Sequence, residues 1–406
     1  MGKTIWILNH YATNMYIDKG GRHYWIAKEL LSHGYTPVIF CASTLHFGNE
    51  DIHLSKEKIT IKKQEGITFV FVKCSEYQKE NVKARVKNMI DFAIRVVRYG
   101  KKLEKPDIVY ASSAHPLTLI SGIRLSKYFK IPCISEVRDL WPESIVAYSK
   151  YKKDSWLIRC LYRGEHWIYS KSDKIIMTWE GGIDYVKNQG WSNIAGKIIH
   201  IGNGVCLEDF DNNVRKFPYQ DNYITDKNYI NLVYTGSLNK VNNINFLVDV
   251  ATELSKKKSN IRLLIYGDGN ELVQARARKK SENIFFLGRV DKKFIPSIVS
   301  QANINILHNQ STLLDIYGQS QNKLFEYLAA GNPILQTYTT NYSILGKYQC
   351  GVSAQTQSVD AVVNLIGDLS KNKEIQTLYG ENARKAAEKN DFKLLTKKVI
   401  DMIEKL

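Results

Sequence analysis

Residues 321–335 read QNKLFEYLAAGNPIL, and no other stretch indicates the fold of this chain as strongly. A helical pattern follows Lys323, carries the acid Glu326 in its first turn, and stops at a Gly-Asn-Pro sequence before an apolar strand. A carboxylate near a helix start can accept two hydrogen bonds from the vicinal hydroxyls of a ribose, and a lysine can hold a phosphate as a point charge. The stretch therefore predicts a nucleotide site. An ordinary amphipathic helix with a Lys–Glu pair explains the same residues equally well.

Short apolar strands alternate with helical segments along almost the whole chain. The expected strands are 4–8, 36–41, 68–72, 108–111, 133–137, 174–178 and 197–201, and then 230–235, 261–266, 284–287, 304–307, 333–337 and 351–354. Helical spacing marks 23–33, 81–103, 243–256 and 323–330. Such alternation is typical of parallel sheets with helices on both faces. The predicted fold class is α/β, with two Rossmann-like, doubly wound domains that face a cleft.

The length of 406 residues favours two domains, because one ordinary core rarely grows so large. A stretch rich in Asn, Asp and Gly, at about 202–226, lacks periodicity and marks the boundary. We expect an N-terminal domain over 1–204 and a C-terminal domain over 205–384. A final helix at about 385–406 has no strand after it and is able to pack back on the N-terminal domain.

The chain is strongly basic, with 57 basic and 40 acidic side chains and a net charge of +17. Residues 1–204 hold 31 of the basic and 19 of the acidic side chains, so the excess is concentrated there. A basic surface attracts anionic lipid, nucleic acid or phosphorylated substrates. No nucleic-acid motif is present, so we expect no nucleic acid as partner; binding to it would rest on charge alone.

Other classes of protein are disfavoured by simple patterns. The six cysteines show no CxxC or Cys/His spacing, so neither a zinc site nor a disulfide framework is indicated. No secretory signal opens the sequence, and no run approaches the ~18 apolar residues of a membrane span. We expect a cytoplasmic protein. No pattern indicates its oligomeric state.

Glycine turns follow several of the predicted strands. They lie at Gly20-Gly21, Gly202-Asn203-Gly204, Gly267-Asp268-Gly269 and Gly288-Arg289-Val290. Paired glycines let backbone N–H groups approach an anion at a helix start, and the carboxyl ends of strands are where such folds bind ligands. A plain turn explains each of them singly. Their shared position at strand ends indicates one ligand-binding cleft.

With these features in order, the chain resembles the GT-B-fold glycosyltransferases of family 4, the retaining nucleotide-sugar transferases, over nearly its whole length. The motifs that carry the resemblance are Gly20-Gly21 with AKELLSHGY, PDIVYASS, IGNGV, YTGSL, IYGDGN, FLGRV and NKLFEYLAAGNPIL. SEVRDLWPES, at 135–144, resembles the bacterial subgroup that builds O-antigen and capsular polysaccharides. Some members of that subgroup are described as N-acetylfucosamine transferases.

The resemblance implies roles for individual residues. Glu326 would bind the ribose hydroxyls and Lys323 the diphosphate, with backbone N–H groups after the first glycine pair. Further donor contacts are implied at Gly20, Gly21, Gly204, Gly236, Lys240, Gly267, Gly288, Arg289 and Val290. The last three would form the turn that binds the base.

Three residues of the N-terminal half are candidates for the chemistry itself. Arg138 stands where many family members place a histidine near the transferred sugar, and Asp139 would orient the acceptor or the sugar. An Arg–Asp pair that pins the loop is the plain alternative. His115, after another strand, is a further candidate; a turn histidine with no chemical role explains it as well.

The chain departs from the family pattern at three places. Many members grip the diphosphate with an arginine and a lysine where this chain has Ser237 and Asn242, and hold sugar hydroxyls with a glutamate where it has Gly318. Lys323, Arg138 or Lys240 would then bind the diphosphate in their place. The alternative is that activity is reduced or lost.

The resemblance implies transfer of a sugar, for example an N-acetylated amino sugar such as N-acetylfucosamine, from a UDP-sugar to a polyprenyl-diphosphate-linked saccharide in surface polysaccharide biosynthesis. The basic, partly apolar helix at 81–105 would place the protein on the inner face of the cytoplasmic membrane; a core helix with a solvated basic face is the alternative. No metal is expected, and the DxD at 209–211 reads as a helix start. Rival functions are a nucleotide-sugar 2-epimerase and an inactive sugar-nucleotide-binding partner protein.

Overall fold

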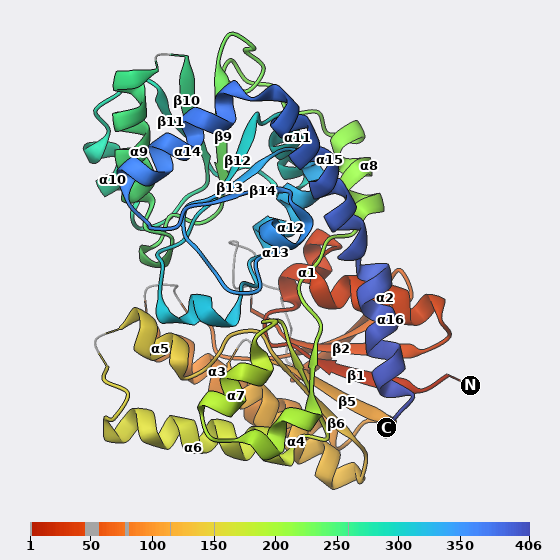
Figure 1. Cartoon of the computed structure of the whole chain (residues 1–406). Coiled ribbons are helices and arrows are strands. Elements are labelled where there is room, and N and C mark those ends of the chain that lie inside the picture. Colours follow the sequence, from red (N-terminus) through yellow and green to blue (C-terminus); the bar gives the residue numbers. More distant parts are fainter. Residues whose placement is uncertain (1, 45–56, 78–80, 114, 150, 259) are drawn as a thin grey trace. The chain divides into compact units, whose positions relative to one another are not determined.

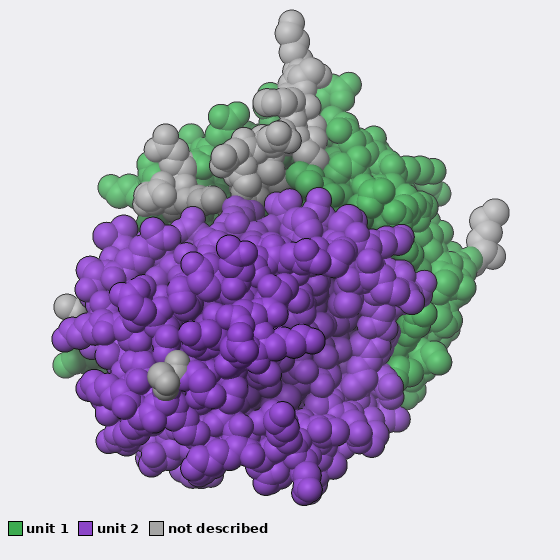
Figure 2. All heavy atoms as spheres, turned by 90° about the horizontal axis from the view of Figure 1, so that it is seen from above, with its two compact units in different colours: residues 1–202, 392–406 green, residues 203–391 purple. Residues whose placement is uncertain are grey.

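The computed structural model describes residues 2–44, 57–77, 81–113, 115–149, 151–258 and 260–406. The chain divides into two compact units, coloured separately in Figure 2. Unit 1 comprises residues 1–202 and 392–406, and unit 2 comprises residues 203–391. The division falls two residues before the boundary expected from the sequence.

Unit 1 contains a sheet with the strand order β3-β4-β2-β1-β5-β6-β7-β8 in its described part (Figure 1). Its strands are β1 (Thr4–Leu8), β2 (Thr36–Ala42), β3 (Ile59–Gln64), β4 (Ile67–Val72), β5 (Ile108–Ser112), β6 (Cys133–Val137), β7 (Lys174–Met177) and β8 (Ile198–His200). Its helices are α1 (Thr13–Asp18), α2 (Arg22–Ser32), α3 (Val82–Gly100), α4 (Pro116–Phe129), α5 (Glu143–Tyr148), α6 (Trp156–Lys171), α7 (Gly182–Asn188), η1 (Ser192–Lys197) and α16 (Phe392–Ile403).

The winding of unit 1 reverses between β1 and β5. From β1 the chain runs to β2 and β4 on one side, and from β5 it runs to β6, β7 and β8 on the other. Because crossovers between parallel strands are right-handed, α2 covers one face of the sheet and α3, α4 and α6 cover the opposite face. The carboxyl ends of β1 and β5 therefore border a topological switch point, where folds of this kind bind ligands.

Strand β3 is an element that the sequence patterns missed. It pairs antiparallel with β4 at the sheet edge, joined by a tight turn in which Glu65 and Gly66 both have positive φ. Its sequence, ITIKKQ, is half-exposed and charged, as suits an edge strand that must not pair further. The parallel sheet expected for this half thus carries one antiparallel edge.

Unit 2 contains a parallel sheet with the order β11-β10-β9-β12-β13-β14. Its strands are β9 (Ile230–Thr235), β10 (Ile261–Tyr266), β11 (Ile284–Gly288), β12 (Ile304–Leu307), β13 (Ile334–Gln336) and β14 (Gly351–Ser353). Its helices are α8 (Leu207–Lys216), η2 (Lys240–Asn242), α9 (Ile244–Lys257), α10 (Leu272–Arg278), η3 (Lys292–Phe294), α11 (Ile295–Ser300), η4 (Leu313–Tyr317), α12 (Asn322–Ala330), α13 (Ile344–Tyr348), α14 (Val359–Lys371) and α15 (Lys373–Lys389). The winding reverses between β9 and β12.

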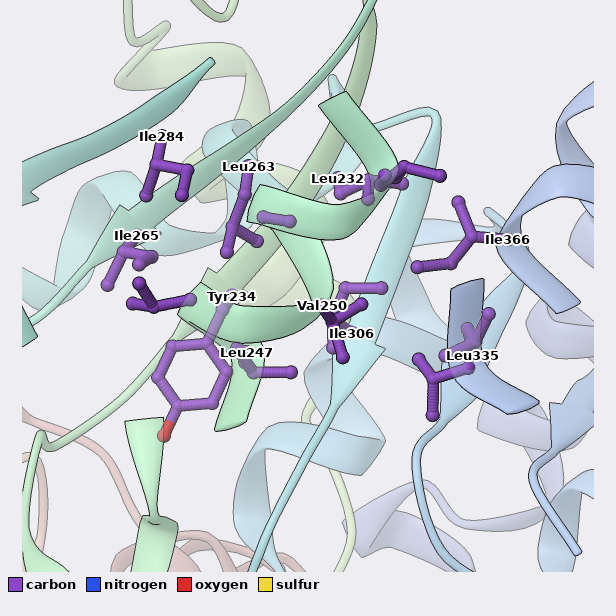
Figure 3. Close-up of a cluster of buried hydrophobic side chains, with 14 of the residues drawn as sticks. Leu232, Tyr234, Leu247, Val250, Leu263, Ile265, Ile284, Ile306, Leu335 and Ile366 are labelled. Atoms are coloured by element: carbon purple, nitrogen blue, oxygen red, sulfur yellow. The ribbon is translucent and has the colours of Figure 1, made fainter. Parts of the chain in front are cut away.

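Apolar side chains fill both faces of the unit 2 sheet. On one face, α9 and α14 pack on β9, β10 and β12, and Figure 3 shows Leu247, Leu263 and Ile306 meeting there. On the other face, α8, α11, α12 and α15 enclose a second cluster. Strand β10 is buried along its whole length, as expected of a central parallel strand covered on both sides. Tyr234 closes the first cluster, with its hydroxyl pointing away from the aliphatic side chains.

The end of the chain differs from the single final helix predicted at about 385–406. Helix α15 ends at Lys389, and α16 begins at Phe392. The break is held by Asp391, whose carboxylate accepts the Leu207 N–H at 3.0 Å, and by Val205, whose N–H donates to Asn390. Helix α16 then belongs to unit 1, where it packs on α2.

No helix in the described residues has both the length and the hydrophobicity needed to cross a bilayer.

The predicted α/β fold with two doubly wound units is confirmed.

Candidate functional site

Three glycine turns meet at the carboxyl edge of the unit 2 sheet. The Gly236 N–H donates to Tyr266 O at 3.0 Å, and the Gly267 N–H donates to Gly288 O at 2.8 Å. A Cβ on Gly267 would lie 1.8 Å from the carbonyl oxygen of Gly236, so this turn leaves no room for any side chain. The turns after β9, β10 and β11 thus pack backbone against backbone, and this packing alone requires glycine at 267.

Lys323 reaches this edge from the first turn of α12. Its ammonium donates to the Tyr234 hydroxyl at 3.0 Å and lies 4.2 Å from the centre of the Tyr234 ring. The ammonium has room there because Gly236 has no side chain. A Cβ on Gly236 would lie 2.9 Å from Lys323 Nζ. Burial lowers the pKa of Lys323 to about 7, although the nearby Glu326 carboxylate raises it. A lysine held in this way gains its charge readily when an anion binds beside it.

Glu326 is half-buried one turn further along α12. Burial raises the pKa of its carboxyl, while Lys292 and Lys323 lower it. Among the described residues it makes no hydrogen bond and no ion pair, so Lys323 and Glu326 do not form the ordinary Lys–Glu pair considered above. A half-buried carboxylate without a protein partner is suited to accept hydrogen bonds from a ligand.

Ser237 and Asn242, at the positions where the resemblance implies an arginine and a lysine, form a closed polar turn. The Asn242 side-chain amide donates to Ser237 O at 2.6 Å and to Ser237 Oγ at 2.9 Å. The Tyr234 hydroxyl also donates to Ser237 O, at 3.2 Å. Neutral hydrogen bonds thus hold the loop at the two positions where the resemblance implies an arginine and a lysine. Lys240, in the short helix η2, is exposed beside this turn.

Gly318, at the position where the resemblance implies a glutamate, has a role in the local backbone. Gly318 has a φ of 100° and ends the helix η4. The nearby Asp315 caps η4, because its carboxylate accepts the Thr312 N–H and the Ser311 hydroxyl, each at 2.8 Å. Burial raises the pKa of Asp315. Its carboxylate is therefore engaged in the loop itself.

The predicted base-binding turn follows β11. Gly288 has a φ of 78°, and Arg289 is exposed beyond it. Val290 packs, together with Tyr219 and Phe294, against a hydrophobic cluster that contains Tyr266 and Ile298. The turn therefore presents one exposed guanidinium and one apolar surface beside the Gly267 turn to which it is hydrogen-bonded.

Gly204 follows the residue that begins unit 2, Asn203. Asn203 is buried, and its amide donates to Ser320 O at 2.5 Å and to Ser320 Oγ at 3.1 Å. Ser320 precedes α12, so the junction is fastened to the loop that leads into Lys323.

Arg138 and Asp139 follow strand β6 in unit 1. Arg138 is half-buried, and its Nε has no hydrogen-bond partner. Its carbonyl accepts the Trp179 indole N–H at 2.8 Å, which fixes the backbone. Asp139 is exposed, and the structure of these described residues contains no Arg138–Asp139 ion pair. The loop is pinned by its backbone, and the guanidinium is not used for that purpose.

His115 lies at the start of α4, at the switch point of unit 1. It is buried, and its Nε2 lies 2.8 Å from Nδ1 of His10, which follows β1. Burial, together with the charge of Arg85, lowers the pKa of His115 to about 4. His115 is therefore neutral at physiological pH. His10 was not singled out from the sequence, although it follows the first strand directly.

Gly20 and Gly21 connect α1 to α2. Gly21 has a φ of 102°, and the Gly20 N–H donates to Met15 O at 3.2 Å. Helix α2 then begins with Arg22, so the pair opens a helix as predicted. The turn itself is fixed by the α1 carbonyl.

A buried polar network behind this turn was missed by the sequence patterns. Glu136 of β6 accepts hydrogen bonds from Arg22 at 2.8 Å, from His23 at 2.9 Å and from the Tyr110 hydroxyl. Burial opposes its ionisation, but Arg22 and His23 hold the pKa of Glu136 well below its usual range. Arg22 also donates to the Ile201 carbonyl at 2.9 Å. An acid within an otherwise apolar strand was the signal that could have revealed it.

No group of His, Cys, Asp and Glu suited to a metal ion occurs in the part of the chain that the structure describes. The DxD acids lie in the first half of α8. Asp211 pairs with Arg384, with one contact at 2.9 Å, and Asp209 accepts from Asn213 at 3.0 Å.

Comparison with known proteins finds a family model that matches part of unit 2. Residues 218–386 match the family model described as Glycosyl transferases group 1. No curated protein sequence matches the chain significantly.

Solved structures share the fold over the whole chain. Sucrose-phosphate synthase from Thermosynechococcus elongatus has a TM-score of 0.72 at 13% identity, over 99% of this chain and 98% of that one. The trehalose-6-phosphate structure from E. coli bound with UDP-2-fluoro glucose has a TM-score of 0.72 at 12% identity, over 99% of both chains. Anabaena HepE in complex with UDP and glucose has a TM-score of 0.67 at 12% identity, over 100% of both.

These likenesses show the GT-B fold that the sequence predicts. Together with the family match they support a glycosyltransferase and favour transfer over the isomerase alternative. The match is to glycosyl transferases group 1 and to no narrower subgroup.

Replacing Gly236 by alanine should destabilise unit 2 and displace Lys323. The φ of 144° is one that side-chain-bearing residues rarely adopt, and the new Cβ would meet Lys323 Nζ at 2.9 Å. We expect the free energy of unfolding in urea to fall by about 1–3 kcal/mol. The matched control is Gly367→Ala in α14, where nothing lies within 4 Å and helix propensity should add about 0.5–1 kcal/mol. Equal stability of Gly236→Ala and the wild type would contradict this reading of the turn.

Proposed function

We propose that this protein is a retaining glycosyltransferase that moves a sugar from a UDP-sugar to a lipid-linked saccharide in surface polysaccharide biosynthesis. The observation that carries the proposal is the pair on α12: a half-buried Lys323 with a lowered pKa beside a half-buried Glu326 that has no partner among the described residues. Both lie within the segment that matches glycosyl transferases group 1. The solved structures of the same fold that contain UDP or UDP-2-fluoro glucose support a uridine nucleotide.

Each part of the donor has a candidate partner in unit 2. Glu326 accepts hydrogen bonds from the ribose hydroxyls, and Lys323 holds the diphosphate. The base lies on the turn of Gly288, Arg289 and Val290, where one apolar and one cationic group are available. Gly236 and Gly267 let the backbone of their turns come close to the donor, and the exposed Lys240 adds positive charge.

The chemistry requires stabilisation of charge on the leaving group. As the glycosidic bond breaks, the sugar becomes oxocarbenium-like and negative charge grows on the diphosphate. Preorganised cations and N–H dipoles stabilise that charge, and in other enzymes the loss of one donor costs about 100- to 1,000-fold in rate. Lys323 supplies such a cation: the negative charge of the bound diphosphate raises the pKa of the ammonium, which takes up a proton from the solvent and regains the charge that burial disfavours. The departing diphosphate takes the acceptor proton.

Unit 1 contributes the acceptor side. We assign Arg138 to the diphosphate or the transferred sugar and Asp139 to the orientation of the acceptor. The half-buried guanidinium, whose Nε lacks a partner, and the exposed carboxylate support this assignment. Gly20 and Gly21, in the turn before α2, and Gly204, in the segment after β8, are assigned to donor contacts through their backbone N–H groups.

A membrane surface is the second partner that we propose, at the inner face of the cytoplasmic membrane. Helix α3 carries an exposed apolar stripe of Val82, Val86, Ile90 and Ile94, of which Val82 is 70% and Ile94 56% exposed. Exposed lysines at 83 and 87 flank it, while Phe92 on the opposite face is fully buried. A helix that is apolar on its outer face as well as its inner one, with cations at its border, suits an anionic leaflet.

Further exposed groups extend this membrane surface. Trp156 at the start of α6 is 78% exposed, and Lys152 and Lys153 precede it. Tryptophan and lysine side chains both favour the interfacial region of a bilayer.

The donor site is tested by thermal unfolding with UDP, GDP and ADP. A ligand that binds only the folded protein raises the unfolding temperature by mass action, and we expect UDP to do so. Glu326→Ala removes the ribose hydrogen bonds, so its affinity for UDP should fall about 10- to 100-fold and the shift should largely disappear. The control is Glu381→Ala, an exposed acid on α15, whose shift should match that of the wild type.

Two results would overturn the donor assignment. If no nucleotide shifts the wild type, the inactive-partner alternative takes its place. If Glu326→Ala responds to UDP like the wild type, the ribose is held elsewhere.

The membrane surface is tested by flotation with vesicles of phosphatidylglycerol and phosphatidylcholine. The double variant Ile90→Glu, Ile94→Glu should bind at least about tenfold more weakly, because two half-exposed apolar side chains no longer enter the bilayer. The control is Ile375→Glu, Leu378→Glu, at two exposed apolar positions of α15 in unit 2. Equal binding of both variants, or no binding by the wild type, would reject α3 as the docking surface.

A further inference from the structure

Helix α5 follows the loop of Arg138 and Asp139 directly in unit 1 (Figure 1). None of its six residues is fully buried, so no side chain anchors this helix in the core. A helix this short is not stable by itself and depends on contacts with its neighbours. The loop before it is tight: the Trp141 N–H donates to Asp139 O at 3.0 Å, and the Ser144 N–H donates to Leu140 O at 2.7 Å. The orientation of α5 and that of the loop are therefore linked.

The Glu143 carboxylate, in the first turn of α5, joins this helix to its surroundings. It accepts hydrogen bonds from the Tyr162 hydroxyl of α6 and from the Gln189 amide at the end of α7, the latter at 3.0 Å. The Lys153 ammonium, in the segment between α5 and α6, lies 3.3 Å from the same carboxylate. One side chain of α5 thus reaches three other points of unit 1.

The three contacts of Glu143 differ in strength. Hydrogen bonds to an ionised acceptor are about twice as strong as those between neutral groups. The Glu143 side chain is only 15% exposed, whereas that of Lys153 is 55% exposed. A lysine that exposed forms the kind of surface ion pair that contributes little. The attachment of α5 therefore depends mainly on Tyr162 and Gln189.

A second carboxyl joins α6 to α7 without Glu143. Glu165 of α6 is buried, and it accepts the hydroxyl of Tyr169 at 2.6 Å and that of Tyr185 of α7 at 2.7 Å. The two helices are thus fixed to each other independently of α5. It follows that the contacts of Glu143 hold α5 on this pair of helices and are not needed to hold the pair together.

The other end of the loop is fixed by its backbone. The Arg138 N–H donates to Ser113 Oγ at 3.0 Å, and Arg138 O accepts the Trp179 indole N–H at 2.8 Å. Beyond Arg138, the side chain of Leu140 is buried and holds the middle of the loop inward. The direction in which the loop then leaves is set by α5. A functional side chain needs such a support, because its own contacts do not fix it in the productive geometry.

We propose that Glu143 is a positioning residue. By holding the start of α5 on Tyr162 and Gln189, it keeps the loop of Arg138 and Asp139 in the orientation that sugar transfer requires. The inference rests on the proposed function and adds to it a residue that acts through the loop and not on the substrates.

The orientation of the loop is measured first, without any substrate. Trp141 lies within the loop, so its indole resonance in the nitrogen-15-labelled full chain, assigned through Trp141→Phe, reports the position of the loop. Glu143→Gln should shift this resonance. Gln189→Met keeps the length of the side chain and removes only its donor, and we expect it to shift the resonance in the same direction. Because residue 189 is far from the loop in the sequence, its effect does not arise from local chemistry at Glu143.

Turnover is measured next, as the release of UDP from UDP-N-acetylglucosamine and from UDP-glucose. A small misplacement of a reacting group can cost about 100-fold in rate, and we expect Glu143→Gln to lower kcat at least about tenfold. Gln189→Met should lower kcat less, because two of the three contacts remain. The KM for the donor and the affinity for UDP should stay unchanged, since Lys323 and Glu326 belong to unit 2. The matched control is Glu104→Gln, an exposed acid of unit 1, which should behave like the wild type in both measurements.

Two results would overturn the positioning role. One is an unchanged Trp141 resonance in both Glu143→Gln and Gln189→Met. The other is a shifted resonance with an unchanged kcat. A wild type that neither binds UDP nor releases it from either donor, while both variants shift the Trp141 resonance, would reject the proposed function and leave the support of the loop by Glu143 standing.

Discussion

The backbone contact between the turns after β9 and β10 sets the geometry on which the donor site depends. The carbonyl of Gly236 lies where a side chain at residue 267 would be, and the next turn joins through the hydrogen bond from Gly267 to Gly288. With no side chain on Gly236, the Lys323 ammonium reaches the Tyr234 hydroxyl at the sheet edge. A cation is thereby held partly out of water, and its pKa falls to about 7. A charge this costly to maintain needs an anionic partner, and a diphosphate is the one that we propose.

Both units place polar groups at the point where the winding of the sheet reverses, but the groups differ between the units. Each sheet reverses its winding once, and at each reversal the structure places buried or half-buried polar groups. In unit 2 these are a lysine and an unpartnered glutamate, suited to a nucleotide. In unit 1 they are the buried His10 and His115, with Arg85 nearby.

The sequence predicted most of the fold because buried parallel strands and amphipathic helices carry strong periodic patterns. Strand β10, buried on both faces, was located to the residue. Strand β3 escaped because half of its residues are exposed and two of these are charged. The break at Asn390 escaped because it depends on a hydrogen bond from the backbone N–H of Leu207, far away in the sequence, to the Asp391 carboxylate. Lys323 and Glu326 were found as candidates from their spacing on α12. The Glu136 network and the role of Glu143 were not, since they depend on contacts between distant segments.

Proton uptake on UDP binding tests the central claim most directly. Titration calorimetry at pH 8, in two buffers of different ionisation enthalpy, counts the protons taken up. With a pKa of about 7 the lysine is roughly nine-tenths neutral at this pH and must be protonated to hold the diphosphate. The account predicts uptake of close to one proton by the wild type, little uptake by Lys323→Met, and weaker UDP binding as the pH rises above 7. UDP binding with the same proton count in both proteins would contradict it.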